Sequence, residues 1–445
     1  MQSPIKITVN RWLDRVFELS RYHTTARREV IAGLTTFFTM AYIVAVNPAV
    51  LKSAGMPLGA SLTATIVTAI AGTLLMGLYA KRPFAIAPYM GENAFIAFTV
   101  VQVLGYSWQR ALGAVFVAGI LFVLLTLFRL RQWVVDAVPA SLRYSYAVGI
   151  GLFLTFIGLN QTGIVTLGFP GAPVRSGHLT SASVLLSVFG FLLMTALTIR
   201  RFPAAILTGV LATAVLSFVT RVAPAPTAWV SQPPSLRPVF LQFHLHGLLS
   251  WSFFPVVLTI FVMAFVDTMG TLIGVSARAG FLDKDGNLPQ IERPMMADAL
   301  ATTIAALVGT TTSGAYIESA TGVEAGGRTG LTAVTTAVCF SGALFFAPFI
   351  SAIPPQAYGP ALIFVGLLML SPITRIPFDD LTELVPAFGV IVLMAFTYNV
   401  GVGMTAGFVL YPLCKLLSGR VREIRPALWV LTVLSLLFFV FYPYT

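Results

Sequence analysis

The chain has 445 residues, of which 57% are hydrophobic and only 10% charged, and its mean hydropathy is +0.88. A soluble protein carries roughly 25% charged residues, so this composition excludes a soluble globular domain and predicts an all-α polytopic membrane protein. The net charge of +11 could suggest nucleic-acid binding, but the distribution of the basic residues, described below, argues against such a partner.

The chain begins with a basic tail, residues 1–28, which holds six Lys and Arg residues. It lacks a small-residue cleavage site after a short apolar run, so we do not expect a removed signal peptide. Trp12, Val16 and Phe17 share one side of a short helical pattern. That pattern fits either an interfacial helix or an ordinary cytoplasmic tail.

Apolar blocks of ~17–22 residues follow, the length that crosses a bilayer core. Seven of the clearest are residues 31–46, 62–79, 111–128, 183–199, 254–274, 331–350 and 427–442. Counting all blocks predicts about 14 spans. They fall into two halves, 29–220 and 251–425, joined by a Pro-rich outer loop, 221–250.

The C-terminal region leaves one span too many. Residues 384–417 read as a hairpin that turns at 398–403, and the apolar segment 426–445 then follows it. The last segment is either a reentrant or interfacial helix, or else one arm of the hairpin is short.

The basic residues predict the orientation. If the N-terminus is cytoplasmic and the spans alternate, only five of the 27 Lys and Arg residues fall outside: Lys52, Arg110, Arg175, Arg221 and Arg237. This is the positive-inside bias of multi-pass proteins. The positive charge therefore reflects topology in a bacterial inner membrane, with the lipid bilayer as the surrounding partner.

Two apolar segments are interrupted in the same way, about half the chain apart. Residues 86–95 and 309–322 each open with small, Gly-, Pro- or Thr-rich stretches that suit an extended strand, then carry an acidic or amide side chain where a helix could begin. Paired interruptions are typical of inverted-repeat transporters, because a broken backbone at membrane depth is tolerated only where it lines a protein-enclosed cavity. The alternative is a pair of kinked structural helices.

The 16 acidic residues narrow the search for a site. Most fall in the tail, in loops or near span ends: Asp14, Glu18, Glu29, Asp136, Asp283, Asp285, Glu292, Asp298, Asp379, Asp380, Glu383 and Glu423. Glu92, Asp267, Glu318 and Glu324 remain. A carboxylate near the bilayer centre costs ~2.5–3.5 kcal/mol on insertion scales, so it indicates function by default.

Each of these candidates has a structural alternative. Asp267 lies in mid-span, with Thr271 on the same polar face, and is a candidate proton carrier or a hydrogen-bond partner of a neighbouring helix. Glu318 and Asn93 stand at the two helix starts, where they either bind a ligand or cap the helix. Glu92 either joins the site or faces away, and Glu324 is expected to pair with Arg328 at the inner mouth.

Other chemistries find little support. The four histidines, His23, His178, His244 and His246, lie in the tail or outer loops, so neither a metal site nor a histidine proton relay is expected. We assign no disulfide or metal role to Cys339 and Cys414. The sequence contains no Walker loop that would bind ATP. We therefore expect no cofactor and no enzymatic activity, and any proton coupling would have to run through carboxylates.

At these residues the chain resembles the nucleobase–cation symporter family, which includes the uracil and xanthine permeases, and within it the azaguanine, hypoxanthine-guanine and adenine permease branch. The resemblance covers about residues 25–425 and is carried by 32–48 (AGLTTFFTMAYIVAVNP), 90–95 (MGENAF), 266–274 (VDTMGTLIG) and 316–332 (YIESATGVEAGGRTGLT). The chain departs at Tyr89-Met-Gly-Glu92, where many relatives have Gly-Met-Gly-Leu.

The resemblance implies two inverted seven-span repeats arranged as a core and a gate domain, with short strands in spans 3 and 10. It also implies proton-coupled uptake of purine bases (adenine, guanine or hypoxanthine). The base-binding residues would be Asn93, Asp267 and Glu318, assisted by Phe95, Ala94, Tyr316 and Ile317, with Glu92 and Thr271 as further candidates. Proton coupling would fall on Asp267 or Glu318. The oligomeric state stays open, a homodimer included.

The sequence argues against two other functions. A sulfate- or bicarbonate-type anion carrier of the same fold should place a cation at the second helix start, where this chain has Glu318. An integral-membrane enzyme would need a His/Asp cluster or several basic residues on one face, and the sequence offers neither.

Overall fold

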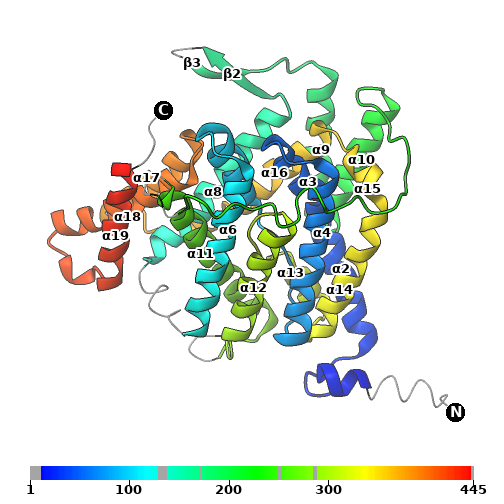
Figure 1. Ribbon diagram of the computed structural model, residues 1–445, viewed down its shortest axis with the longest axis horizontal. Coiled ribbons are helices and arrows are strands. Elements are labelled where there is room, and N and C mark those ends of the chain that lie inside the picture. Colours follow the sequence, from blue (N-terminus) through cyan, green and yellow to red (C-terminus); the bar gives the residue numbers. More distant parts are fainter. Residues whose placement is uncertain are drawn as a thin grey trace.

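The computed structural model describes residues 12–128, 138–169, 172–248, 250, 253–283 and 288–441. Parts of the predicted tail, the connecting loop and the last apolar segment lie outside these ranges, as do Asp136 and Asp285. The described chain is mainly helical. In Figure 1 the helices form one body, with the C-terminal helices (orange to red) at one end and the N-terminal segment at the other.

The first half contains eight α-helices and three strands among the described residues. In chain order they are α2 (Ala26–Met40), α3 (Ile43–Ser53), α4 (Leu58–Leu74) continued by the π-helical η1 (Leu75–Tyr79), β1 (Ile86–Pro88), α5 (Met90–Ala94) continued by the π-helical η2 (Phe95–Val103), α6 (Trp108–Leu127), α8 (Ala140–Gln161), β2 (Val165–Phe169), β3 (Ala172–Ser176), α9 (Ala182–Ile199) and α10 (Ala205–Val219). The β2–β3 hairpin projects from the helical body (Figure 1).

The second half begins with α11 and repeats the early pattern. Its elements are α11 (Phe254–Ala279), α12 (Glu292–Val308), β4 (Ser313–Ala315), α13 (Ser319–Glu324), α14 (Gly330–Ala343), η3 (Leu344–Phe346), α15 (Ala347–Ser351), α16 (Pro355–Leu368), η4 (Ser371–Arg375), α17 (Leu381–Phe396), α18 (Val400–Leu417), η5 (Val421–Glu423) and α19 (Pro426–Phe441). In both halves a short strand is followed by a short helix and then by a longer helix.

Nine helical stretches among the described residues are long and apolar enough to cross a membrane, and three shorter apolar helices accompany them. The predicted polytopic all-α membrane fold is therefore confirmed, while the count of 14 and the domain boundaries stay predictions. The C-terminal hairpin is present as α17 and α18, with its turn at 397–399. Its first arm has only 16 residues, and α19 packs against α18.

The two interrupted spans meet through their strands. β1 and β4 pair antiparallel, with Ile86 opposite Ala315, Ala87 opposite Gly314 and Pro88 opposite Ser313. Pairing satisfies backbone groups that lipid would leave without partners. Because the strands come from corresponding places in the two halves and run in opposite directions, the structure confirms the predicted strands and the inverted relation of the repeats.

The helices pack into two groups. One contains α2, α3, α4, α6, α11, α12 and α14, and the other contains α8, α9, α10, α16, α17, α18 and α19. This grouping matches the expected core and gate. The broken third span touches both groups, because α5 contacts α3 and α8.

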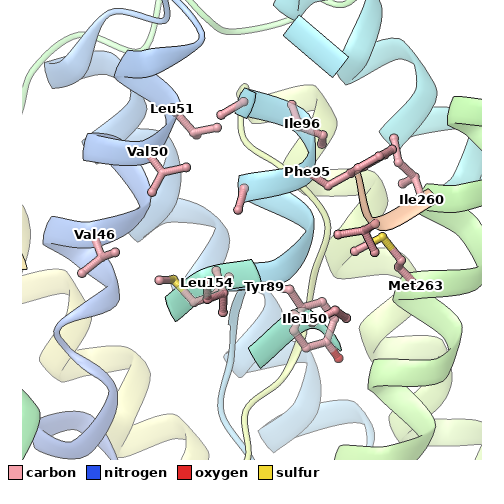
Figure 2. Close-up of a cluster of buried hydrophobic side chains, with 14 of the residues drawn as sticks. Val46, Val50, Leu51, Tyr89, Phe95, Ile96, Ile150, Leu154, Ile260 and Met263 are labelled. Atoms are coloured by element: carbon pink, nitrogen blue, oxygen red, sulfur yellow. The ribbon is translucent and has the colours of Figure 1, made fainter. Parts of the chain in front are cut away.

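Buried apolar side chains fill the region where the groups meet. Figure 2 shows part of this cluster: Val46, Val50 and Leu51 of α3, Tyr89, Phe95 and Ile96 of the broken span, Ile150 and Leu154 of α8, and Ile260 and Met263 of α11. Apolar packing against four elements holds the short α5 helix, whose five residues could not be stable alone.

Candidate functional site

Four carboxylates gather around two stacked tyrosines at the paired strands. The rings of Tyr89 and Tyr316 lie almost parallel, with centroids 6.3 Å apart and an interplanar angle of 7°. Tyr89 is close to Glu92, Asp267 and Asp298, and Tyr316 is close to Glu92, Asp267 and Glu318. The fold therefore brings Asp267 and Glu318 of the second half to the same place as Glu92 of the first half.

Glu318 stands at the N-terminus of α13, directly after β4. Its side chain makes no capping hydrogen bond to its own helix. Glu318 therefore does not act as the helix cap that was its structural alternative. Instead, the Tyr42 hydroxyl between α2 and α3 donates to Glu318 Oε1 at 2.6 Å. The Glu318 side chain is thus oriented by a donor from the opposite repeat.

Asp267 lies in the middle of α11 and is partly exposed within the protein. The carboxyl group of Glu92, which is fully buried, faces Asp267 within hydrogen-bonding reach, and no other described donor contacts either Glu92 oxygen. Open space adjoins this pair: a Cβ added at Gly270, one turn along α11, would meet nothing within 4 Å. Thr271, on the same helix, is partly exposed.

Asn93 is fully buried in α5 and joins a polar network. Its Nδ2 donates to Asn47 Oδ1 at 2.6 Å, and Asn47 in turn donates to Thr65 (2.7 Å) and Thr310 (3.1 Å). Asn93 Oδ1 has no hydrogen-bond partner. The amide is therefore fixed by its nitrogen, and its oxygen remains able to accept a hydrogen bond.

The remaining predicted contact residues differ in their surroundings. Ala94 is fully buried, and Phe95 lies in the apolar cluster shown in Figure 2. The Tyr316 hydroxyl donates to the Pro88 carbonyl across the strand pair. Ile317 has 59% of its surface exposed, the largest exposure in this group. Ile317 and the backbone around it thus present the accessible side of the second break.

Asp298 lies near the start of α12, in agreement with its expected place near a span end, but it belongs to the candidate site from which that place had excluded it. The structure places it fully buried in α12, where its Oδ2 accepts from the Ala315 N–H of β4 at 3.0 Å and its Oδ1 has no partner. Thr268 lies close to it and contacts the Tyr89 hydroxyl at 3.2 Å. The available signal was an isolated acid within the small-residue run 295–308 of a helix that continues past it.

Glu29 was assigned to the N-terminal region but is fully buried. Its carboxylate accepts from the backbone N–H of Arg328 (3.0 Å) and of Thr329 (3.1 Å) and from the Thr332 hydroxyl (2.6 Å). These donors surround the start of α14, where a helix N-terminus favours negative charge. Glu29 therefore ties α2 to α14.

The expected pairing of Glu324 with Arg328 is wrong. Glu324 pairs with Arg278 at 3.0 Å, and both side chains are exposed. The guanidinium of Arg328 instead folds back on its own turn and donates to the carbonyls of Val323 and Gly327. Backbone acceptors within reach of that side chain hold the guanidinium away from Glu324.

The sequence of the chain is similar to those of known permeases. Residues 27–408 match the model described as Permease family (Xan_ur_permease). The adenine permease AdeP of Escherichia coli is 41% identical over 96% of this chain and 96% of its own, and the guanine/hypoxanthine permease PbuG of Bacillus subtilis is 40% identical over 96% and 99%.

Among solved structures, the transmembrane domain of the cyanobacterial bicarbonate transporter BicA has the same fold. It aligns with a TM-score of 0.62 at 13% identity, covering 86% of this chain and 97% of that domain. At this identity the likeness concerns the fold alone. The sequence matches decide the family: the chain belongs to the Permease family, and it is a multi-pass membrane transporter rather than an enzyme.

Proposed function

We propose that this protein imports purine nucleobases and couples their uptake to protons. The observation that carries the proposal is the position of Glu318: a carboxylate at the start of a half-helix in the second broken span, oriented by Tyr42 and near Tyr316, which Asp267 also neighbours. The named permeases of adenine and of guanine/hypoxanthine that align over nearly the whole chain support the substrate class.

The proposed recognition follows from the shape and polarity of a purine. The base is flat and neutral, with N–H donors and ring-nitrogen or carbonyl acceptors along its edges. Glu318 accepts from an N–H edge, and one carboxylate can receive two adjacent donors. The unbonded Oδ1 of Asn93 offers a further acceptor. Ile317 and the neighbouring backbone contact the apolar face of the ring.

The proposed proton site is Asp267, with Glu92 beside it. Two carboxylates that face each other repel when both are ionised, so such a pair favours holding a proton between them. Protonation from outside and release inside would then accompany movement of the core against the gate. Glu318 is the other candidate for the proton, because it too lies at the junction of the two repeats.

We further propose a cytoplasmic N-terminus in a bacterial inner membrane. The support is the positive-inside distribution of Lys and Arg. Homodimerisation stays a prediction.

Replacing Glu318 by Gln tests the proposal directly. The amide keeps the size of the side chain but exchanges one acceptor for a donor and removes the charge. We expect uptake of radiolabelled adenine, guanine and hypoxanthine by a permease-deficient strain to fall at least ~100-fold, as expected when a site built to bind N–H donors loses its acceptor. The matched control is Glu324→Gln, since Glu324 forms only an exposed ion pair. Wild-type uptake by the Glu318→Gln protein would refute the assignment.

Likeness to the BicA fold keeps an anion carrier as the second candidate. The two functions differ in the charge needed at the half-helix, because an anion would meet the carboxylate of Glu318 there. Uptake of a radiolabelled purine separates the two functions when it is measured against unlabelled competitors, with and without a protonophore. The competitors are adenine, guanine, hypoxanthine, xanthine, uracil and sulfate. Inhibition by purines and by the protonophore supports proton-coupled purine import, and inhibition by sulfate alone supports the anion carrier.

A further inference from the structure

A cavity of about 640 Å³ lies between the start of α8, the segment before α17, the end of α18 and the start of α19, and its lining includes no residue of the candidate site. Its lining includes five cationic side chains, Arg143, Arg375, Lys415, Arg420 and Arg425, and three carboxylates, Asp380, Glu383 and Glu423. The lining thus has a surplus of two positive charges. All five cations belong to the set that the positive-inside pattern assigns to the cytoplasmic side.

The carboxylates are already engaged with two of the cations. Lys415, whose side chain is only 1% exposed, pairs with Glu383 at 2.7 Å and with Glu423 at 2.6 Å. Arg420 pairs with Asp380 at 2.7 Å. Together with that pair, hydrogen bonds from the Thr382 hydroxyl and N–H hold the pKa of Asp380 at about 2, so this carboxylate stays ionised. The acids therefore offset Lys415 and Arg420, and they form no ion pair with Arg143 or Arg375 among the described residues.

Arg143 and Arg375 lie on the same cavity without a carboxylate partner among the described residues. Arg143 Nε is buried and has no hydrogen-bond acceptor. The guanidinium of Arg375 lies over the ring of Tyr144, 5.8 Å from its centroid, and the side chain is otherwise exposed. A buried guanidinium nitrogen without an acceptor is costly, which indicates that an anionic ligand completes this site.

We propose that this cavity binds a phosphate group, supplied by the headgroup of an anionic phospholipid of the inner leaflet or by a soluble phosphate. Guanidinium groups match the geometry of phosphate oxygens and bind them through paired, charge-assisted hydrogen bonds. Basic pockets between spans on the cytoplasmic side are suited to anionic headgroups. Val138 and Leu428 add apolar surface to the lining, beside which a glycerol backbone and the first acyl carbons can lie.

The test measures binding of short-chain phosphatidylglycerol to the purified full-length protein in a phosphatidylcholine nanodisc. We expect wild-type protein to bind phosphatidylglycerol and not the equivalent phosphatidylcholine. The double variant R143Q/R375Q should bind it about 100-fold more weakly, because one charge-assisted hydrogen bond contributes about tenfold in affinity. The control R200Q changes an exposed arginine of the connection between α9 and α10, and its affinity should equal that of wild type.

Competition with inorganic phosphate distinguishes the two sources. Phosphatidylglycerol that stays bound in excess phosphate identifies the lipid headgroup, whereas its displacement by phosphate identifies a soluble ligand. Equal affinity of wild type and R143Q/R375Q for phosphatidylglycerol, with no binding of phosphate, would overturn the proposal. If the double variant fails to fold, R375Q replaces it, because Arg375 is exposed. Its affinity for phosphatidylglycerol should then fall about tenfold. An affinity equal to that of wild type would again overturn the proposal.

Discussion

Gly314 offers the sharpest test of the strand pair as the framework of the site. It lies in the middle of β4, opposite Ala87. A Cβ at this position would lie 2.2 Å from the Tyr89 hydroxyl oxygen and 2.5 Å from its Cζ. Since ordinary contact begins near 3.4 Å, the Gly314→Ala variant must displace Tyr89 or β4 by about 1 Å. Tyr89 is only 7% exposed and contacts Thr268, so it has little room to yield.

Such overpacking costs about 1–3 kcal/mol. If the cost falls on the transport-competent arrangement, it corresponds to roughly 5- to 150-fold lower purine uptake at limiting substrate. Uptake is measured per amount of protein in the membrane, together with the thermal midpoint in detergent.

The matched control is Gly274→Ala in α11, where an added Cβ meets nothing within 4 Å. Alanine is the better helix former by about 0.5–1 kcal/mol, so this variant should transport within about twofold of wild type at an equal or higher midpoint. Wild-type uptake by the Gly314→Ala protein would refute the reasoning that the packing of β4 on Tyr89 positions the site.

Three further predictions follow from single contacts. Tyr42→Phe removes the 2.6 Å hydrogen bond to Glu318 and should lower purine uptake at limiting substrate about tenfold or more. The control is Tyr358→Phe, which loses a 3.3 Å hydrogen bond to a neutral amide. Equal uptake by the two variants would contradict the role of Tyr42. Glu29→Ala removes three hydrogen bonds at the start of α14 and should destabilise the protein by about 3 kcal/mol, so an unchanged thermal midpoint would count against it. The pKa of Asp380 lies at about 2, below its unfolded value of ~3.9. The stability that the ionised Asp380 contributes is therefore complete above about pH 4 and is lost as the pH falls through about 2. Between these pH values the thermal midpoint of the Asp380→Asn protein should fall less than that of wild type.

The sequence alone predicted the broken spans, because their physical cause is local. A run such as 309–315, rich in Gly, Thr and Ser, cannot continue a helix inside lipid without leaving backbone groups unpaired. The isolated acids Asp267 and Glu318 were also visible, because a carboxylate stands out in an apolar run. These signals predicted the extended segments that form β1 and β4, while the resemblance to the family implied that the two acids share a site beside them.

The sequence could not place Asp298 or Glu29, because the role of each depends on a partner distant in the chain. Asp298 lies early in its helix, and only the position of β4 gives its carboxylate the Ala315 N–H to bind. Glu29 precedes by about 300 residues the helix start that it stabilises. The same limit applies to Tyr42, which reads as an ordinary aromatic residue until α13 is placed beside it.

For this protein, then, composition and local pattern determined that the chain crosses a membrane, where it breaks and which acids are costly enough to require a reason. The tertiary structure decided which side chains share one site: it joined Tyr42 to Glu318 and Glu92 to Asp267, and it gave Glu324 to Arg278 rather than Arg328. The physical reason is that the insertion cost of a charge and the helix-breaking tendency of Gly and Pro belong to the residue itself. A hydrogen bond between two repeats belongs to the way they pack.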